Sequence, residues 1–545
     1  MYRQKTMSRR RGIVLLLIMV LGSLGLWYLY SNTVIPSRGL TKTVLGIIDV
    51  NGPILLSSDA DMYTGIINMA LTNESIKAVV IKINCPGGYA NLIEQIYFDL
   101  LQLKNKKPIC AVAISALSGG YYIAVASDYI YVQPTSTMGN VGVIGQGPPI
   151  LIPSEQALET GPEKLTGYSR LGFAFNLRHA LNSFVSAVLS GRKDRLKLTL
   201  IELKKGSIYL GSEAIATGLA DEAGSVQSAI NRAARQANIT EYETQDLNKI
   251  YQASLASSLS LQSKIEWRNL TLETLDEMIP PPALYYLYLP PKILHQGIQS
   301  IQPSEEEVSN VTKSGNGLIL IDETHGNLAS ARVFNRLMGE LTRRNATSGL
   351  VYTWKELSED LANASCLIVA SPTTDYSKDE VDRIEKFVDA GGMLFLFYDP
   401  AADYVEVPAL SEPINTLAAR FGILFAEGYL YNQEENYGNY RNIYVKDLAN
   451  HNLTEGLSAI VLFTATHIYT SEKDLAWTSN STYSSTAEKA GNYTAIAASH
   501  RGSTIAFGDV SFLDEPYCNV ADNERLLRNL ASIMASVGLP AARGH

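Results

Sequence analysis

Short β-rich runs alternate with helical stretches from Thr43 onward, and this alternation constrains the fold more than any other feature of the sequence. Strands and helices that alternate along a chain form βαβ units, in which helices cover the faces of a largely parallel sheet. Residues 90–107 place their apolar positions on one helical face between the second and third runs. The sequence therefore predicts an α/β domain over residues 43–240, with buried strands at 43–50, 77–84, 109–115 and 129–134.

A second α/β domain is predicted over residues 314–540, after a connector over residues 241–313 that carries a Pro-rich aromatic strip. Ser377 and Glu380 have the spacing of a capping box at the start of a helix. The candidate strands of this domain are residues 317–326, 366–372, 393–400 and 503–512. The pattern is typical of a doubly wound sheet of the flavodoxin type.

Four side chains that can bind a metal lie at the expected C-terminal ends of these strands: Asp322, His325, Asp399 and Asp509. Ligands bind at this edge of doubly wound sheets, so a metal site is conceivable. Surface turns and helix caps use the same residue types, and we favour that interpretation. No metal and no other cofactor is predicted.

Residues 12–30 form an uncharged stretch of 19 residues, close to the ~20 that cross a bilayer as a helix. Basic residues are concentrated before the stretch, so the positive-inside rule places residues 1–11 in the cytoplasm and both α/β domains outside it. A cleaved signal peptide is the alternative. We favour a single-pass membrane anchor, because no clean A-x-A cleavage pattern follows the stretch.

Composition and sequons agree with an exported protein. Nine Asn-x-Ser/Thr sequons fit a glycosylated ectodomain better than a cytoplasmic enzyme. Lys plus Arg number 45 against 54 Asp plus Glu, and the net charge of −9 argues against nucleic-acid binding. The four cysteines lie far apart without a CxxC pair, which excludes a zinc ribbon and leaves one lone disulfide possible.

Two strand–turn–helix junctions with paired glycines carry the strongest chemical signal. One junction holds Gly87 and Gly88 after the second strand, and the other holds Ser118 and Gly119 after the third. Glycines let backbone N–H groups approach a ligand oxygen, and a helix start favours a developing oxyanion. We interpret Ser118 as a nucleophile whose oxyanion hole is formed by Gly119 N–H and by Gly87 or Gly88 N–H. The alternative is a helix N-cap serine between ordinary turns.

A nucleophilic serine needs a base. His179 is the single histidine of residues 31–294, and it lies in an amphipathic helix where a surface or packing role is favoured. A lysine can act instead if its pKa is lowered by burial or by neighbouring cations. Lys164 is preferred over a highly charged and solvated group formed by Lys193, Lys197, Lys204 and Lys205.

Four ordered motifs of the first domain resemble the signal peptide peptidase A family of Ser/Lys proteases, within the Clp protease/crotonase superfamily. The motifs are NCPGG, ALSGGYYIAVASDYIYVQPTSTMGNVGVIG, TGPEK and IYLGSEAIATGLADEAG. The resemblance implies Ser118 as nucleophile, Lys164 as general base and the same three glycines as oxyanion donors. It also implies a substrate groove lined by Gly139, Val141, Gly142 and Val143. A single protease core implies a homo-oligomer, since the family forms ring-like assemblies.

The second domain contains the motifs IDETHGN, IVASPTTDYSKDEVDRIEKFVDAGGMLFLFYDP and AFGDVSFLDEPYCNVADNERLLRNLASIM. With these motifs it resembles glutamine-amidotransferase-like domains of unknown function in exported prokaryotic proteins. Together with the sequons, this suggests an archaeal-type protein. Catalytic members of that group need a cysteine at a tight strand–helix turn, where this chain has Asp399 and Pro400. The resemblance therefore implies a non-catalytic binding module.

The predicted function is a membrane-anchored serine endopeptidase that degrades cleaved signal peptides or other hydrophobic peptides near the membrane. Its expected partners are peptide substrates, the membrane and further copies of the chain, with no nucleic acid. Two alternatives stay open. One is an inactive scaffold or receptor that retains the protease fold, and the other is a crotonase-like acyl-CoA enzyme, which acyl-CoA binding would distinguish.

Overall fold

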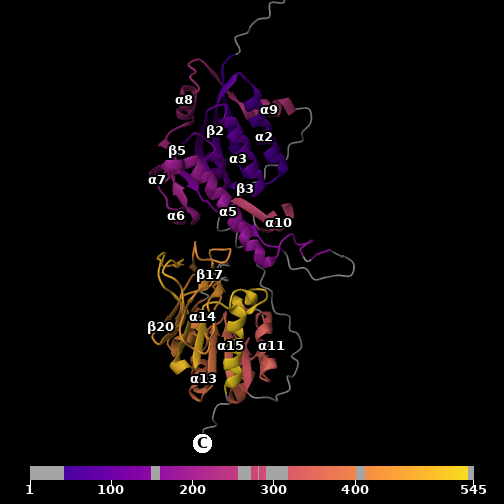
Figure 1. Ribbon diagram of the computed structural model, residues 1–545, viewed down its shortest axis with the longest axis vertical. Helices are drawn as coiled ribbons and strands as arrows, with labels where there is room; N and C mark the ends of the chain where they lie inside the picture. Colours follow the sequence, from indigo (N-terminus) through magenta and orange to yellow (C-terminus); the bar gives the residue numbers. More distant parts are fainter. Residues whose placement is uncertain are drawn as a thin grey trace, which may run out of the picture.

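The computed structural model describes residues 42–148, 160–161, 163–255, 270, 272–279, 281–289, 317–329, 331–400 and 411–537. Figure 1 shows two α/β units, one before and one after the undescribed residues 290–316. The predicted anchor at residues 12–30 lies outside the described residues. Within the part of the chain that is described, none of the helices is long and apolar enough to span a bilayer.

The first unit is built on a seven-stranded sheet in the order β7-β5-β4-β2-β1-β9, with β8 paired to β5. The pairs among β5, β4, β2, β1 and β9 are parallel, and β7 runs antiparallel to β5. The four predicted strands are confirmed as part of this sheet. Its strands are β1 (Val44–Asn51), β2 (Ile76–Cys85), β4 (Ile109–Leu117), β5 (Tyr129–Gly139), β7 (Ile208–Leu210), β8 (Glu222–Ala223) and β9 (Glu243–Asp246).

Helices cover both faces of this sheet, as the alternation predicts. The helices α2 and α3 bury their apolar faces in the main core, whereas α8 packs with a smaller cluster on the other face of β2 and β4. The helices are α2 (Ser57–Thr72), α3 (Ala90–Lys104), α4 (Gly119–Ala124), α5 (Arg170–Arg192), α6 (Leu200–Lys204), α7 (Gly211–Thr217), α8 (Val226–Gln236), α9 (Leu247–Leu255) and α10 (Leu272–Met278).

The first unit continues past residue 240, where the sequence analysis ended it. Strand β9 pairs in parallel with β1 and so completes the edge of the main sheet. Strand β10 (Ala283–Leu287) is the middle strand of a separate sheet, between β3 (Gly87–Tyr89) and β6 (Ile144–Gln146). The described parts of the expected connector are thus largely elements of the first unit, because their apolar side chains are buried against it.

The second unit has an eight-stranded sheet in the order β12-β11-β13-β14-β24-β23-β21-β18. Its first five strands are parallel and follow the order 2-1-3-4-5 of a doubly wound sheet, and the remaining pairs are antiparallel. The strands are β11 (Leu318–Asp322), β12 (Thr347–Val351), β13 (Ala364–Ala370), β14 (Met393–Phe397), β18 (Asp447–Leu448), β21 (Lys473–Trp477), β23 (Thr494–Ser499) and β24 (Thr504–Phe507).

Helices and small ribbons complete this unit. The predicted capping box is confirmed, since Ser377 accepts from Glu380 N and Glu380 accepts from Ser377 N at the start of α13. The helices are α11 (Asn335–Arg343), α12 (Trp354–Asp360), α13 (Lys378–Asp389), α14 (Ser411–Ala418) and α15 (Asn523–Ser536). The ribbons pair β15 (Ile423–Phe425) with β20 (Ile468–Thr470), β16 (Leu430–Tyr431) with β22 (Tyr483–Ser484), and β17 (Asn442–Val445) with β19 (Ile460–Phe463).

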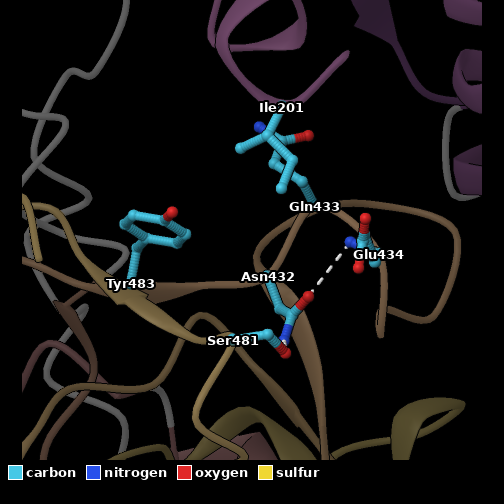
Figure 2. A pocket seen from close by; sticks show the side chains of 6 residues that line it. All are labelled: Ile201, Asn432, Gln433, Glu434, Ser481 and Tyr483. Carbon is cyan, nitrogen blue, oxygen red and sulfur yellow. Dashed lines mark hydrogen bonds between the residues drawn. The ribbon is translucent and has the colours of Figure 1, made fainter. Parts of the chain in front are cut away.

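The two units meet where α5 and α6 face a loop of the second unit. Arg178 on α5 donates to the carbonyl oxygen of Asn436 at 2.8 Å, and Phe175 lies edge-on to Tyr437. Figure 2 shows Ile201 of the first unit above Gln433 of this loop. A hollow of about 60 Å³ remains there, large enough for a water molecule or two.

The cysteines and sequons are also placed by the fold. All four cysteines are buried and free, so the lone disulfide that the sequence left possible is absent. Seven of the sequon asparagines are described, and all are exposed: Asn73, Asn238, Asn345, Asn363, Asn452, Asn480 and Asn492. Their exposure is compatible with glycosylation, which itself stays a prediction.

A buried ion pair anchors the end of α5. The two terminal guanidinium nitrogens of Arg192, Nη1 and Nη2, donate to the Asp221 carboxylate at 2.9 and 2.8 Å. The Arg192 side chain is fully buried. Burial alone would raise the pKa of Asp221, but hydrogen bonds from Arg192 and the Arg192 charge hold that pKa below its usual value. The neighbouring Leu219 carbonyl accepts from Tyr121 on α4, so this loop also supports the helix that follows Ser118.

Asp221→Asn should lower the free energy of unfolding of the first unit by about 3–5 kcal/mol, because it leaves the Arg192 charge buried without a partner. Denaturant titration of the full chain measures this loss. The depressed pKa stabilises the fold above the unfolded value of about 4, so the difference from wild type should shrink as pH falls through the folded pKa. Asp246→Asn is the control: its pair with Lys249 is exposed, and a change of about 1 kcal/mol or less is expected.

Candidate active site

Ser118 links β4 to α4 in a conformation that non-glycine residues rarely adopt. Its φ is 49° and its ψ is −117°, and only 1% of the residue is exposed. The Ser118 N–H donates to the Gly139 carbonyl, and its own carbonyl accepts from the amides of Tyr121 and Tyr122. The backbone on both sides is therefore fixed, and it holds the serine at a sharp strand-to-helix turn.

The N-cap alternative for Ser118 is wrong. An N-cap residue has an extended backbone, and its side chain accepts from an amide in the first turn. Ser118 has a positive φ, and its hydroxyl makes no such bond to α4. A strained, non-capping serine at the end of a central strand is typical of a functional position, where the surrounding structure enforces the strain.

The glycines of the two junctions converge on one small region beside this turn. A Cβ atom at Gly87, whose φ is 105°, would lie 2.7 Å from the Gly119 nitrogen and 1.8 Å from the Tyr286 carbonyl oxygen. A Cβ atom at Gly119 would lie 2.7 Å from the same oxygen. Gly87 and Gly119 thus border the space that the Tyr286 carbonyl oxygen occupies. A side chain at either position would collide with that oxygen.

The predicted groove residues lie on one side of this space. Gly139 ends β5, Val141 is buried, and Gly142 and Val143 lead into β6. The strand that pairs with β10 is β6 itself, which begins at Ile144. The four predicted residues therefore lie at the end of β5 and in the segment that leads to β6, and the Gly139 carbonyl joins this segment to Ser118.

The candidate bases are both exposed, whereas Ser118 is buried. Lys164 lies in a turn and is exposed, and His179 is exposed on α5. Within the described residues, no hydrogen bond joins the Ser118 side chain to either of them. The turn of Lys164 contacts the β10 segment, since the Cβ position of Gly167 lies 3.3 Å from Pro282 Cγ. The structure thus brings Ser118 and the glycines together, and within the described residues it shows no hydrogen bond between Ser118 and Lys164.

Strand β10 is the part of the site that the sequence analysis missed. Tyr286 lies opposite Gly88 of β3, and Tyr285 lies opposite Ile144 of β6. The signal was present in the apolar run ALYYLYL, which lies between prolines 280–282 and 290–291. The sequence predicts a connector with an anchored aromatic strip here, and it does not reveal where that strip is anchored.

The four candidate ligands of the second unit serve local interactions. Asp322 is fully buried and accepts from Tyr376 OH and Thr324 N, with His325 Nδ1 at 3.3 Å. Asp509 caps the amides of Phe463 and Ser511. Burial and the Asp399 charge raise the pKa of Asp509 to about 8. Among the described residues, no three acidic, histidine or cysteine side chains gather as a metal site would require.

The sequence of the first unit is similar to that of known peptidases. Residues 101–150, which include Ser118, match the model of peptidase family S49. Protease 4 of Haemophilus influenzae is 27% identical over 215 residues, which cover 36% of this chain and 35% of that protein. A putative signal peptide peptidase SppA of Enterococcus faecium is 28% identical over 244 residues, which cover 39% of this chain and 70% of that protein. These similarities to peptidases fall in the first unit, and the family match includes Ser118.

The coverage of these matches is partial. The chain spans about a third of the length of the Protease 4 relatives. Among solved structures, a membrane-bound stomatin-specific protease in complex with a substrate peptide is 19% identical, with a TM-score of 0.27. That match covers 39% of this chain and 99% of the other.

Substitutions of Ser118 should show, through the free energy of unfolding, whether this residue is strained or caps α4. Ser118→Ala should change the free energy of unfolding by less than about 0.5 kcal/mol, whereas loss of an N-cap costs about 1 kcal/mol. Ser118→Gly should raise it by about 1 kcal/mol, because glycine adopts the positive φ without strain. Denaturant titration of both variants measures these changes, and a loss of 1 kcal/mol or more in Ser118→Ala would contradict this account of Ser118.

Proposed function

We propose that the first unit is a serine endopeptidase and that Ser118 is its nucleophile. The observation that carries this proposal is the convergence of a strained serine and two glycine junctions around a bound backbone carbonyl oxygen. A peptidase must hold a peptide carbonyl in this relation to its nucleophile and polarise it with backbone N–H groups. The match of residues 101–150 to family S49 supports the same assignment.

The reaction that follows is acyl transfer. Ser118 Oγ attacks the scissile carbonyl carbon while a base takes the hydroxyl proton, and the negative oxygen rests on amides of Gly119 and of Gly87 or Gly88. The C–N bond then breaks, the base gives the proton to the leaving amine, and an ester to Ser118 remains. A water molecule, deprotonated by the same base, hydrolyses the ester and regenerates the hydroxyl.

Lys164 is the base that we propose for this reaction. A neutral lysine can take the Ser118 proton, and the guanidinium of Arg170 nearby cannot. Lys164 is exposed in the described structure, so the turn at residues 163–167 must move for the two side chains to meet. Its contact with Pro282 links that movement to the β10 segment.

The setting of the enzyme is part of the proposal. We place the chain in a membrane through residues 12–30, with both units outside the cytoplasm and the sequon asparagines glycosylated. Its substrates are signal-peptide remnants or other apolar peptides, which bind by strand addition between β3 and β6. The single protease core assembles as a homo-oligomer, and the second unit binds a partner rather than catalysing a reaction.

One observation favours the scaffold alternative. No base is hydrogen-bonded to the Ser118 side chain within the described residues, and Ser118 is 1% exposed. A chain that kept the fold without activity would share both features. Substitution of Ser118 and of Lys164 distinguishes an active peptidase from an inactive scaffold.

Ser118→Ala should abolish cleavage of a quenched apolar peptide by the full-length chain, because the attacking oxygen is lost. The expected fall in kcat/KM is at least about 10⁴-fold. A fluorophosphonate probe should label the wild type at Ser118 and leave the variant unlabelled, as mass spectrometry of the labelled peptide shows. Cleavage that is equal in both proteins would place the activity elsewhere.

Lys164→Ala should lower kcat by at least about 10²-fold while the fold stays intact, because general-base catalysis contributes that much. Lys197→Ala is the matched control, since Lys197 is also an exposed lysine of the first unit. Equal rates in the two variants would remove Lys164 from the mechanism. Rates are compared across pH, and a rise of rate with pH on the acidic limb that changes only in Lys164→Ala supports its role as the base.

A further inference from the structure

Strand β10 lies where a peptide substrate would bind by strand addition. It is antiparallel to β3 on one side and to β6 on the other, in a three-stranded sheet separate from the main one. The Tyr288 N–H donates to the Pro86 carbonyl at 2.8 Å. Hydrogen-bonded pairs recur every second residue in an antiparallel ladder, so Tyr286 and Gly88 exchange both of their backbone bonds.

The carbonyl of Tyr286 therefore sits in the candidate oxyanion site. Its oxygen accepts from Gly88 N–H, and it lies 1.8 and 2.7 Å from the Cβ positions that Gly87 and Gly119 leave empty. Those are the three glycines to which the oxyanion role was assigned. The segment thus presents its peptide bond between Tyr286 and Leu287 where a scissile bond is expected.

The Tyr286 side chain fills a pocket that recognises it in detail. Its ring stacks on Tyr122 with 5.1 Å between centroids and lies 5.2 Å from the ring of Phe184. Its hydroxyl is 2.9 Å from both Glu94 Oε1 and the Ala180 carbonyl oxygen. Burial and the Glu94 charge raise the pKa of the phenol, which keeps it protonated as a donor. The side chain is fully buried.

The side chains on the other face of β10 are buried in a second, smaller apolar cluster. Ala283, Tyr285 and Leu287 pack in a separate apolar cluster with Leu275 of α10 and Leu55. Tyr286 belongs instead to the main core. Prolines precede and follow the strand, and they limit its hydrogen-bonded length. The strand is thus held by the Tyr286 pocket, by this cluster and by short ladders on both of its edges.

We propose that β10 is an internal pseudosubstrate that occupies the peptide groove, and that the pocket of Tyr286 is a substrate subsite for tyrosine on the acyl side of the cleaved bond. This inference rests on the proposed peptidase function. A substrate gains access when β10 leaves the groove, and the release of Pro282 frees the turn that carries Lys164. In the resting chain β10 fills the peptide groove, and the rate of cleavage depends on how often β10 leaves it.

Tyrosine is selected over phenylalanine because two acceptors face the ring's hydroxyl. A phenylalanine side chain would remove the hydroxyl donor that faces the half-buried Glu94 carboxylate and the Ala180 carbonyl. Sites built to bind a substrate hydroxyl discriminate strongly against the analogue that lacks it. A small side chain would leave the space between Tyr122 and Phe184 unfilled.

The first experiment measures kcat/KM of the full-length chain and of Tyr286→Ala on a quenched peptide that contains Ala-Leu-Tyr-Tyr-Leu. Loss of the ring weakens β10 and empties the pocket, so Tyr286→Ala should be at least about 10-fold more active. Tyr286→Phe, which keeps the ring and loses both hydrogen bonds, should be activated less. Tyr251→Ala on α9, which lies against α2, is the matched control and should cleave as wild type does.

The second experiment compares three peptides on Tyr286→Ala, with tyrosine, phenylalanine or alanine as the fourth residue of that pentapeptide. We expect cleavage after the fourth residue, identified by mass spectrometry, with tyrosine preferred over phenylalanine by about 10-fold or more. Alanine should be the poorest substrate. Equal rates for tyrosine and alanine would refute the subsite.

The outcomes separate this inference from the function on which it rests. Cleavage that depends on Ser118 but is no faster in Tyr286→Ala and Tyr286→Phe than in wild type would make β10 a permanent structural strand and overturn the inference. Absence of Ser118 labelling and of cleavage in all variants would overturn the peptidase function itself. If Tyr286→Ala does not fold, as circular dichroism reports, Tyr286→Phe decides alone.

Discussion

The close approach of backbone segments at the glycine junctions is the constraint on which the site depends. Gly87, Gly88 and Gly119 each leave empty a Cβ position within 3 Å of a backbone oxygen, which belongs to Tyr286 or to Ile54. A methyl group at any of them would push apart β3, α4 and β10. The strained backbone of Ser118 is tolerable because these contacts and the Gly139 carbonyl hold it from every side.

The sequence predicts what is set by local pattern. The four central strands and the Ser118 junction were visible because hydrophobic runs and paired glycines are local signals. The capping box at Ser377 is of the same kind. Asp322 and Asp509 were expected in surface turns or helix caps, whereas both are fully buried and accept from nearby amides.

Long-range pairing accounts for what the sequence could not predict. Tyr286 pairs with Gly88 almost two hundred residues earlier, and a short apolar run between prolines does not identify its partner. The position of Lys164 relative to Ser118 depends in the same way on how the intervening chain folds. The end of the first domain was placed too early because β9 joins β1, the strand with which the sheet begins in sequence.

The four buried cysteines have a practical consequence. Burial raises the pKa values of Cys85, Cys110 and Cys366 to about 12, and that of Cys518 is also raised. Thiolates are the reactive form, so the folded chain offers almost no reactive sulfur at neutral pH. Its thiols report exposure of the interior: the rate at which a maleimide modifies them measures how often each unit opens.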